Sequence, residues 1–174
     1  MNRKTIIFLI IMFGAFCVDN LLGYFLPYNF SYQSITLIPY VSLIMFVFLS
    51  NKVNPSERYL FSIICGLYYA VIYTNSLYVF VIVYCIYAFG VERYANKSTL
   101  SFFEGLLTCG VIVLINETIL YVISCIFGMN SMNILLFVGL RLIPTIIMNL
   151  VLYIPCYFIN TKIQSSNDDF ILDY

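Results

Sequence analysis

Three ionisable residues lie inside long apolar runs of the sequence: Asp19, Glu117 and Arg141. At a rise of about 1.5 Å per helical residue, all three lie roughly 10–15 Å below the outer ends of their runs. An isolated charge near the bilayer centre costs from about 2.5 to more than 10 kcal/mol, so such charges are expected to be paired or hydrated. We therefore expect Arg141 to pair with Glu117, with Asp19 as the competing partner. Two roles stay open for the pair: a contact that fixes helix packing, or part of a polar cavity open to the outer face.

The run "RLIPTIIMNLVLYIPC", residues 141–156, also holds three residues that a hydrocarbon environment disfavours. Pro144 and Pro155 each remove a backbone hydrogen-bond donor, and Asn149 brings a polar amide into the apolar run. We expect these residues, with the three charges, to mark a structural or partner-binding site. A fourth carboxylate, Glu104, comes early in its run, where it reaches the interface or the helix N-terminus, and it is not assigned to this site.

The composition indicates a membrane protein. Of the 174 residues, 63% are hydrophobic and 9% are charged, whereas a soluble domain is roughly 45–50% apolar and about a quarter charged. A domain of this size buries only about 70% of its surface, so lipid must cover much of the apolar excess. The eight basic and eight acidic residues balance, and no nucleic-acid partner is expected.

Six apolar runs are candidate membrane-spanning helices. The expected spans are 5–26, 34–50, 59–74, 77–91, 101–127 and 134–159. Because a span needs about 20 apolar residues, the second, third and fourth are short. The brief connections are rich in Gly, Pro, Asn and Ser, which makes consecutive helices antiparallel neighbours. We expect an all-α integral membrane protein, with a six-span domain over residues 1–160 and a short, polar, loosely ordered tail over 161–174.

Basic residues predict the orientation of these spans. Apart from Arg141, they fall at the N-terminus, in the second and fourth connections and in the tail: Arg3, Lys4, Lys52, Arg58, Arg93, Lys97 and Lys162. The first, third and fifth connections contain no Lys or Arg. By the positive-inside rule, both termini are expected in the cytoplasm.

The residue types that usually perform catalysis or bind metals are scarce. The chain has no histidine, and its six cysteines all lie in apolar runs with no two closer than 16 residues. This spacing contains neither a CxxC motif nor a local pair of metal ligands. Glycine-rich phosphate loops are also missing from the sequence. We expect no enzymatic activity, no metal and no cofactor.

Two stretches resemble a known family. Residues 144–159, "PTIIMNLVLYIPCYFI", resemble the last span of the rod shape-determining protein MreD family, in which a proline, an asparagine and a second proline follow in this order. Residues 65–90, "CGLYYAVIYTNSLYVFVIVYCIYAFG", look like the family's third and fourth spans. Gly66 fits that pattern, but Ala70 stands where the family has an aspartate, and Leu77-Tyr78 replaces the usual Leu-Gly. The length, topology and layout of the whole chain are similar as well.

This resemblance implies a scaffold rather than an enzyme, in a bacterial plasma membrane. MreD-like proteins work with MreC, a single-span partner with a large extracytoplasmic domain, and support peptidoglycan synthesis and cell shape; wall-synthesis enzymes are further expected partners. The family's membrane core is similar in fold to the substrate-binding subunits of energy-coupling-factor transporters. The resemblance also implies that the prolines shape a bent or broken helix and that Asn149 bonds to a neighbouring span. No role of the family aspartate is carried over to Ala70.

Other functional hypotheses remain open on the sequence alone. A small-molecule-binding subunit of an energy-coupling-factor transporter would have the same size and number of spans. Such a subunit should have an outward-facing pocket with convergent polar side chains, and Asp19, Glu117 and Arg141 could line one. A membrane-embedded enzyme is a third hypothesis, but it lacks a candidate catalytic constellation.

Overall fold

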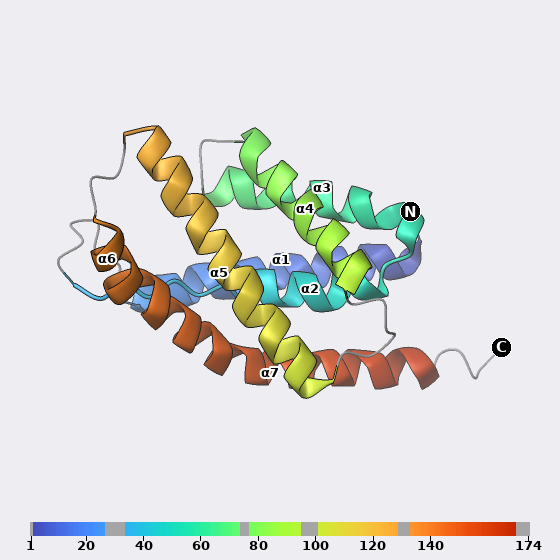
Figure 1. The fold of residues 1–174 in the computed structure, drawn as a ribbon. Helices are drawn as coiled ribbons and strands as arrows, with labels where there is room; N and C mark the ends of the chain where they lie inside the picture. Colours follow the sequence, from blue (N-terminus) through green and yellow to red (C-terminus); the bar gives the residue numbers. More distant parts are fainter. Residues whose placement is uncertain (1, 27–33, 74–76, 95–100, 129–132, 170–174) are drawn as a thin grey trace. The chain divides into compact units, whose positions relative to one another are not determined.

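The computed structural model describes residues 2–26, 34–73, 77–94, 101–128 and 133–169. Within these ranges the fold is all-α, as expected (Figure 1). The elements are α1 (Arg3–Phe25), α2 (Val41–Lys52), α3 (Pro55–Tyr73), α4 (Leu77–Tyr94), α5 (Phe102–Ile126), α6 (Ile134–Phe137), the π-helical turn η1 (Val138–Leu142) and α7 (Ile143–Asp169).

Three of these helices are long and apolar enough to cross a membrane. They are α1, α5 and the run Ile134–Ile163, which joins α6, η1 and most of α7. They contain 23, 25 and 30 residues, which at about 1.5 Å per residue exceeds the roughly 30 Å of a hydrocarbon core. The chain is therefore a multi-pass membrane protein.

The second expected span, 34–50, is not a continuous helix. Residues 35–40 are non-helical, and α2 begins only at Val41. Pro39 accounts for this start, because a proline disfavours the helical conformation of the residue before it. At 12 residues, α2 is about 18 Å long and too short to span a bilayer by itself. Its residues from Ser42 to Ser50 are all buried, as suits a helix with apolar residues all round.

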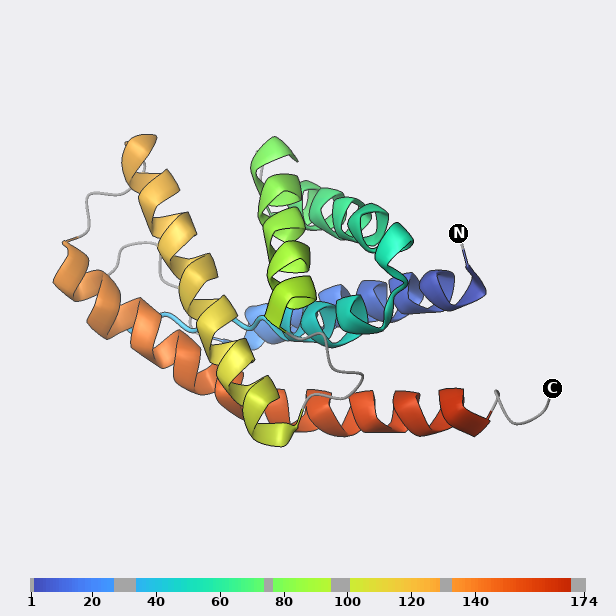
Figure 2. The ribbon, with the colours of Figure 1, turned by 45° about the vertical axis from the view of Figure 1, so that its right-hand side comes forward.

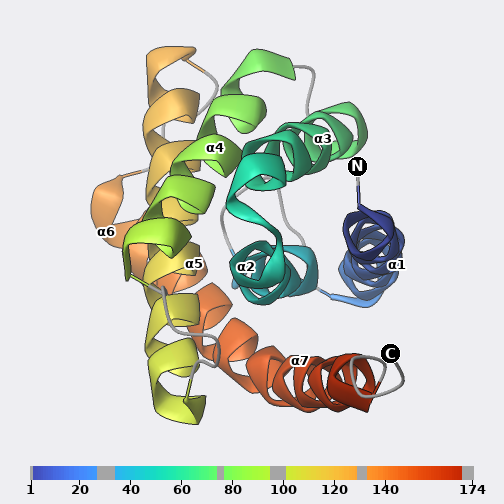
Figure 3. The same cartoon turned by 90° about the vertical axis from the view of Figure 1, so that its right-hand side faces the viewer.

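The helices fall into two compact units. One comprises Met1–Val18 and Ser42–Ser101, and the other Asp19–Val41 and Phe102–Tyr174. In the first unit, α3 and α4 lie side by side (Figure 3). The interior of this unit is aromatic. The ring of Phe46, in α2, stacks on Phe61 with ring centroids 5.7 Å apart, and it meets Tyr84 edge-on at 4.9 Å. Aromatic pairs of this kind add to the apolar burial that holds helices together.

Gly66 permits the close approach of α3 to α4. A Cβ atom at this position would lie 2.7 Å from Val81 Cα and 2.9 Å from the carbonyl oxygen of Phe80. Both atoms belong to the backbone of α4, so they cannot rotate away. The glycine that the family resemblance singled out therefore has a packing role in this chain.

We predict that Gly66→Ala destabilises the α3–α4 pair by about 1–3 kcal/mol, the usual cost of overpacking. Gly90→Ala, in α4, is the matched control, since nothing lies within 4 Å of a Cβ there. That substitution should be neutral or should stabilise its helix by up to about 1 kcal/mol. Denaturation in mixed micelles measures both effects, and equal stabilities of the two variants would contradict the packing role of Gly66.

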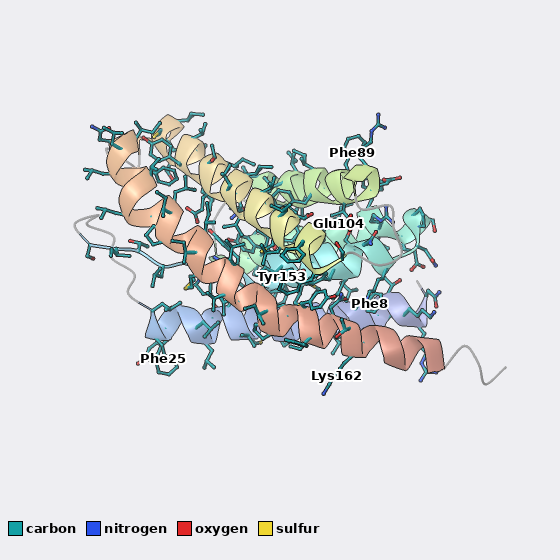
Figure 4. All side chains as sticks on the ribbon, turned by 60° about the horizontal axis from the view of Figure 1, so that its bottom comes forward. Phe8, Phe25, Phe89, Glu104, Tyr153 and Lys162 are labelled. Carbon is teal, nitrogen blue, oxygen red and sulfur yellow. The ribbon has the colours of Figure 1, made fainter. Side chains whose placement is uncertain are left out.

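In the second unit, α5 crosses α7 near the first turns of α5 (Figure 2). The crossing is filled by Tyr153, whose ring points from α7 toward α5, whereas Lys162 points away from α5 (Figure 4). The Tyr153 hydroxyl donates to the Phe102 carbonyl at 3.0 Å. Gly105 leaves room for this ring, since a Cβ there would lie 3.1 Å from Tyr153 Cζ.

The last helix continues beyond the expected end of the sixth span. The backbone of α7 is helical to Asp169, so residues 161–169 of the expected loose tail are helix. No glycine or proline lies between Cys156 and Asp169 to end the helix. The remainder of the expected tail, most of the first connection and Lys97 lie outside the described residues.

Candidate functional site

The polar residues expected within the membrane meet in the second unit. They form a polar cluster that joins the end of α1, the non-helical segment 35–40, α5, η1 and α7. We define this cluster by its six side chains: Asp19, Tyr40, Glu117, Arg141, Thr145 and Asn149.

An ion pair lies at the centre of the cluster. Arg141 Nε is 2.7 Å from Glu117 Oε2, so the pairing expected from their similar depths is present. The Glu117 side chain is 0% exposed and that of Arg141 is 16% exposed. The Tyr40 hydroxyl donates to the other carboxylate oxygen, Oε1, at 2.5 Å. Hydrogen bonds to an ionised group are about twice as strong as neutral ones, so both donors stabilise the buried carboxylate.

Pro144 leaves a carbonyl of its own helix free to bind another segment. In an α-helix the Leu140 carbonyl would accept from the N–H of residue 144, but proline has none. The Leu140 carbonyl instead accepts the Thr36 N–H at 2.9 Å. The same stretch widens into the π-helical turn η1, in which the Ile143 N–H donates to the Val138 carbonyl. Such single π-turns within α-helices are rare and frequently occur at functional sites.

Asn149 also binds the backbone of the non-helical segment. Its Nδ2 donates to the carbonyls of Ile38 and Thr145, both at 2.8 Å, and its Oδ1 accepts the Tyr40 N–H at 2.8 Å. The Thr145 hydroxyl lies 3.4 Å from the Thr36 carbonyl oxygen. Asn149 and Thr145 are both buried. Irregular backbone at membrane depth is tolerated only where its polar groups are satisfied in this way.

Asp19 holds the start of α2. Its Oδ1 accepts the N–H of Val41, the first residue of α2, at 2.6 Å. The first N–H groups of a helix have no partner within it, and a carboxylate at this end also faces the positive end of the helix dipole. The buried Asp19 therefore caps a short helix from another helix, a role that its position in the sequence did not reveal.

Two of the residues noted in the sequence lie apart from these contacts. Pro155 is exposed within α7, and it supplies no contact that defines the cluster. Glu104 is exposed in the first turn of α5, as expected (Figure 4). Tyr40 was missed by the sequence reasoning, although Pro39 beside it is the signal that the span could not be a continuous helix.

The arrangement positions a chain segment by supplying it with hydrogen-bond partners. The side chains of the cluster accept hydrogen bonds from N–H groups of this segment and donate to its carbonyl groups. Among the described residues, no group of three or more His, Cys, Asp and Glu side chains could hold a metal ion.

The fold and the cluster together define a multi-pass, all-α membrane protein with a hydrogen-bonded polar centre. Comparison with known proteins adds no relative: no protein-family model matches the sequence, and no curated protein or solved structure is significantly similar to it.

Proposed function

We propose that the protein is a non-enzymatic membrane scaffold of the MreD type. In this role it binds an MreC-like single-span partner and supports peptidoglycan synthesis and cell shape. Both termini lie in the cytoplasm, the membrane is a bacterial plasma membrane, and the second crossing is made by the segment 35–40 together with α2. The six crossings then follow the fold expected from the resemblance.

One observation carries this proposal: two residues of the family-like motif, Pro144 and Asn149, provide hydrogen-bond partners for the chain's own backbone. Pro144 frees the Leu140 carbonyl for Thr36, and Asn149 joins the Ile38 carbonyl to the Tyr40 N–H. The proline and the asparagine of this motif are thus explained by a core whose backbone polar groups are satisfied within the chain. Such a core suits a protein that presents a fixed surface to partners, because it does not depend on a ligand for its polar groups to be satisfied.

A small-molecule-binding subunit of an energy-coupling-factor-type transporter is the second candidate. The guanidinium of Arg141, on a side chain that is 16% exposed, favours it beside the buried Glu117, since polar groups placed inside an apolar protein often orient a ligand. Against it stand the contacts of Asp19, Glu117 and Asn149, each of which binds a group of this chain.

Purification of the tagged protein from its native membrane in mild detergent distinguishes the two candidates. Mass spectrometry of the retained material should identify a single-span protein with a large extracytoplasmic domain, with or without wall synthases. Recovery of ATPase subunits or a tightly held small molecule, without such a partner, would overturn the scaffold proposal. A span-matched membrane protein carrying the same tag controls for nonspecific retention.

A further inference from the structure

One face of α1 carries a regular row of exposed side chains, which we call the seam. Its six members follow one another at alternating steps of four and three residues, and all are exposed: Ile6, Ile10, Phe13, Cys17, Asn20 and Tyr24. This is the heptad spacing by which two helices pack in a left-handed coiled coil, and most membrane helices cross with the same hand. The other side of α1 holds buried residues, among them Phe8, Met12 and Ala15. The helix therefore buries one face within its own chain and leaves the seam exposed.

Asn20 is the member of the seam that lipid does not suit. Lipid covers the apolar members as well as another helix would, so they do not by themselves call for a partner. Asn20 lies five residues before the end of α1 at Phe25, which is roughly 8 Å along the helix axis. Its side-chain amide makes no hydrogen bond to another residue in the part of the chain that the structure describes. A polar amide among lipid chains is unfavourable without such a bond, so the seam presents a group that needs a partner.

A second copy of the chain supplies a matching group by symmetry. Copies of one membrane protein insert in the same orientation, so two α1 helices would pack in parallel about a twofold axis normal to the membrane. Each residue of the seam then meets its own counterpart at the same depth. A carboxamide is both a donor and an acceptor, so the two Asn20 side chains satisfy each other. One polar residue in an otherwise apolar seam is also the feature that fixes register and the number of helices in coiled coils.

We propose that the protein forms a parallel homodimer through α1, with the seam as its interface and the pair of Asn20 amides as its polar contact. The two Cys17 thiols then face each other across the interface at the same depth. Because Asn20 makes no bond within the described chain, its replacement weakens association. It leaves the fold of the single chain intact in dilute micelles, where the copies are separate. This inference does not depend on the proposed scaffold function.

Oxidative cross-linking of the full-length protein in its native membrane tests the interface with a residue that the seam already contains. Two copies with different tags are expressed together, oxidised with copper–phenanthroline and purified through one tag. The wild type should yield a disulfide-linked dimer that carries both tags, and Cys17→Ser should abolish it. Cys125→Ser is the matched control, because Cys125 is also exposed but lies on α5, and it should leave the dimer unchanged. A Cys17 adduct with a different protein and no Cys17-dependent homodimer, or no Cys17 product at all, would overturn the proposal.

Moving the asparagine around the helix tests the polar contact. The double variant Asn20→Leu with Leu21→Asn keeps the composition but turns the amide by about 100° away from the seam. Energy transfer between fluorophore-labelled copies in lipid vesicles, followed as lipid dilutes them, gives the dissociation constant of the dimer. This constant should rise roughly three- to thirtyfold in the double variant, as expected for the loss of an interhelical hydrogen bond. Leu21→Asn alone keeps Asn20 and should associate as the wild type does. An unchanged constant in the double variant, or an equal rise in Leu21→Asn alone, would overturn the proposal.

Discussion

Among the single changes that remove a polar side chain from the cluster, replacement of Glu117 by alanine should destabilise the protein most. It would leave the guanidinium of Arg141 without its carboxylate and the Tyr40 hydroxyl without its acceptor. Loss of one partner of a buried ion pair costs about 3–5 kcal/mol, because the remaining charge stays buried and uncompensated. The free energy of unfolding in mixed micelles, measured by denaturant titration, should fall by that amount. Glu104→Ala, on the exposed side of the same helix, should change it by less than about 0.5 kcal/mol.

A charge swap separates the pairing from a general need for polar groups. Glu117→Arg and Arg141→Glu should each be severely destabilising, because each places like charges side by side. The double variant restores opposite charges at the same two positions and should recover part of the loss, as coupled residues do in a double-mutant cycle. If the double variant is no more stable than either single reversal, the ion pair does not have the role assigned to it.

Among the changes that remove a polar side chain, Asn149→Leu should have the second largest effect. Leucine keeps the branched shape of asparagine but leaves the Ile38 carbonyl and the Tyr40 N–H without the partners that Asn149 provides. An unsatisfied buried group costs about 1–3 kcal/mol, and interhelical hydrogen bonds in membranes contribute roughly 0.6–2 kcal/mol. We expect a total loss of about 2–4 kcal/mol, within these ranges for two groups. The same unfolding titration measures it.

Asn20→Leu, on α1, is the matched control for Asn149→Leu. Asn20 is exposed in the structure, so leucine at this position should be neutral or slightly stabilising in lipid. A similar loss in both variants would show that the effect of Asn149→Leu comes from asparagine content rather than from the bonds to residues 35–40.

The sequence predicted the helices and the central ion pair because these follow from short-range rules. Apolar runs marked α1, α5 and α7, and charge placed in an apolar run implied a partner, which identified Glu117 and Arg141. Gly66 was noted for its place in a family-like pattern, and the structure supplies the physical reason, the backbone of α4 2.7 Å from a Cβ at that position.

The non-helical segment 35–40 and its hydrogen-bond partners were not predicted because they depend on contacts between distant parts of the chain. Asn149 and Ile38 are 111 residues apart in sequence, and nothing local to either indicates the other. The apolar residues of 34–50 fit a helix and a buried extended segment equally well. Pro39 alone favoured the extended form. Similarly, Asp19 was expected as the competing partner of Arg141, and nothing near it in sequence indicated its hydrogen bond to the N–H of Val41, the first residue of α2.

The most direct test of the central claim is a distance measurement by solid-state NMR on the protein in lipid bilayers. The claim is that polar side chains at membrane depth hold the backbone of residues 35–41. With ¹⁵N on asparagine side chains and ¹³C on isoleucine carbonyls, the Asn149 Nδ2 and Ile38 carbonyl should be in hydrogen-bond contact, with nitrogen and oxygen 2.8 Å apart. That coupling should vanish in Asn149→Leu and persist in Asn20→Leu. Spectra that show no short contact in the wild type, or the same contact in both variants, would contradict the account.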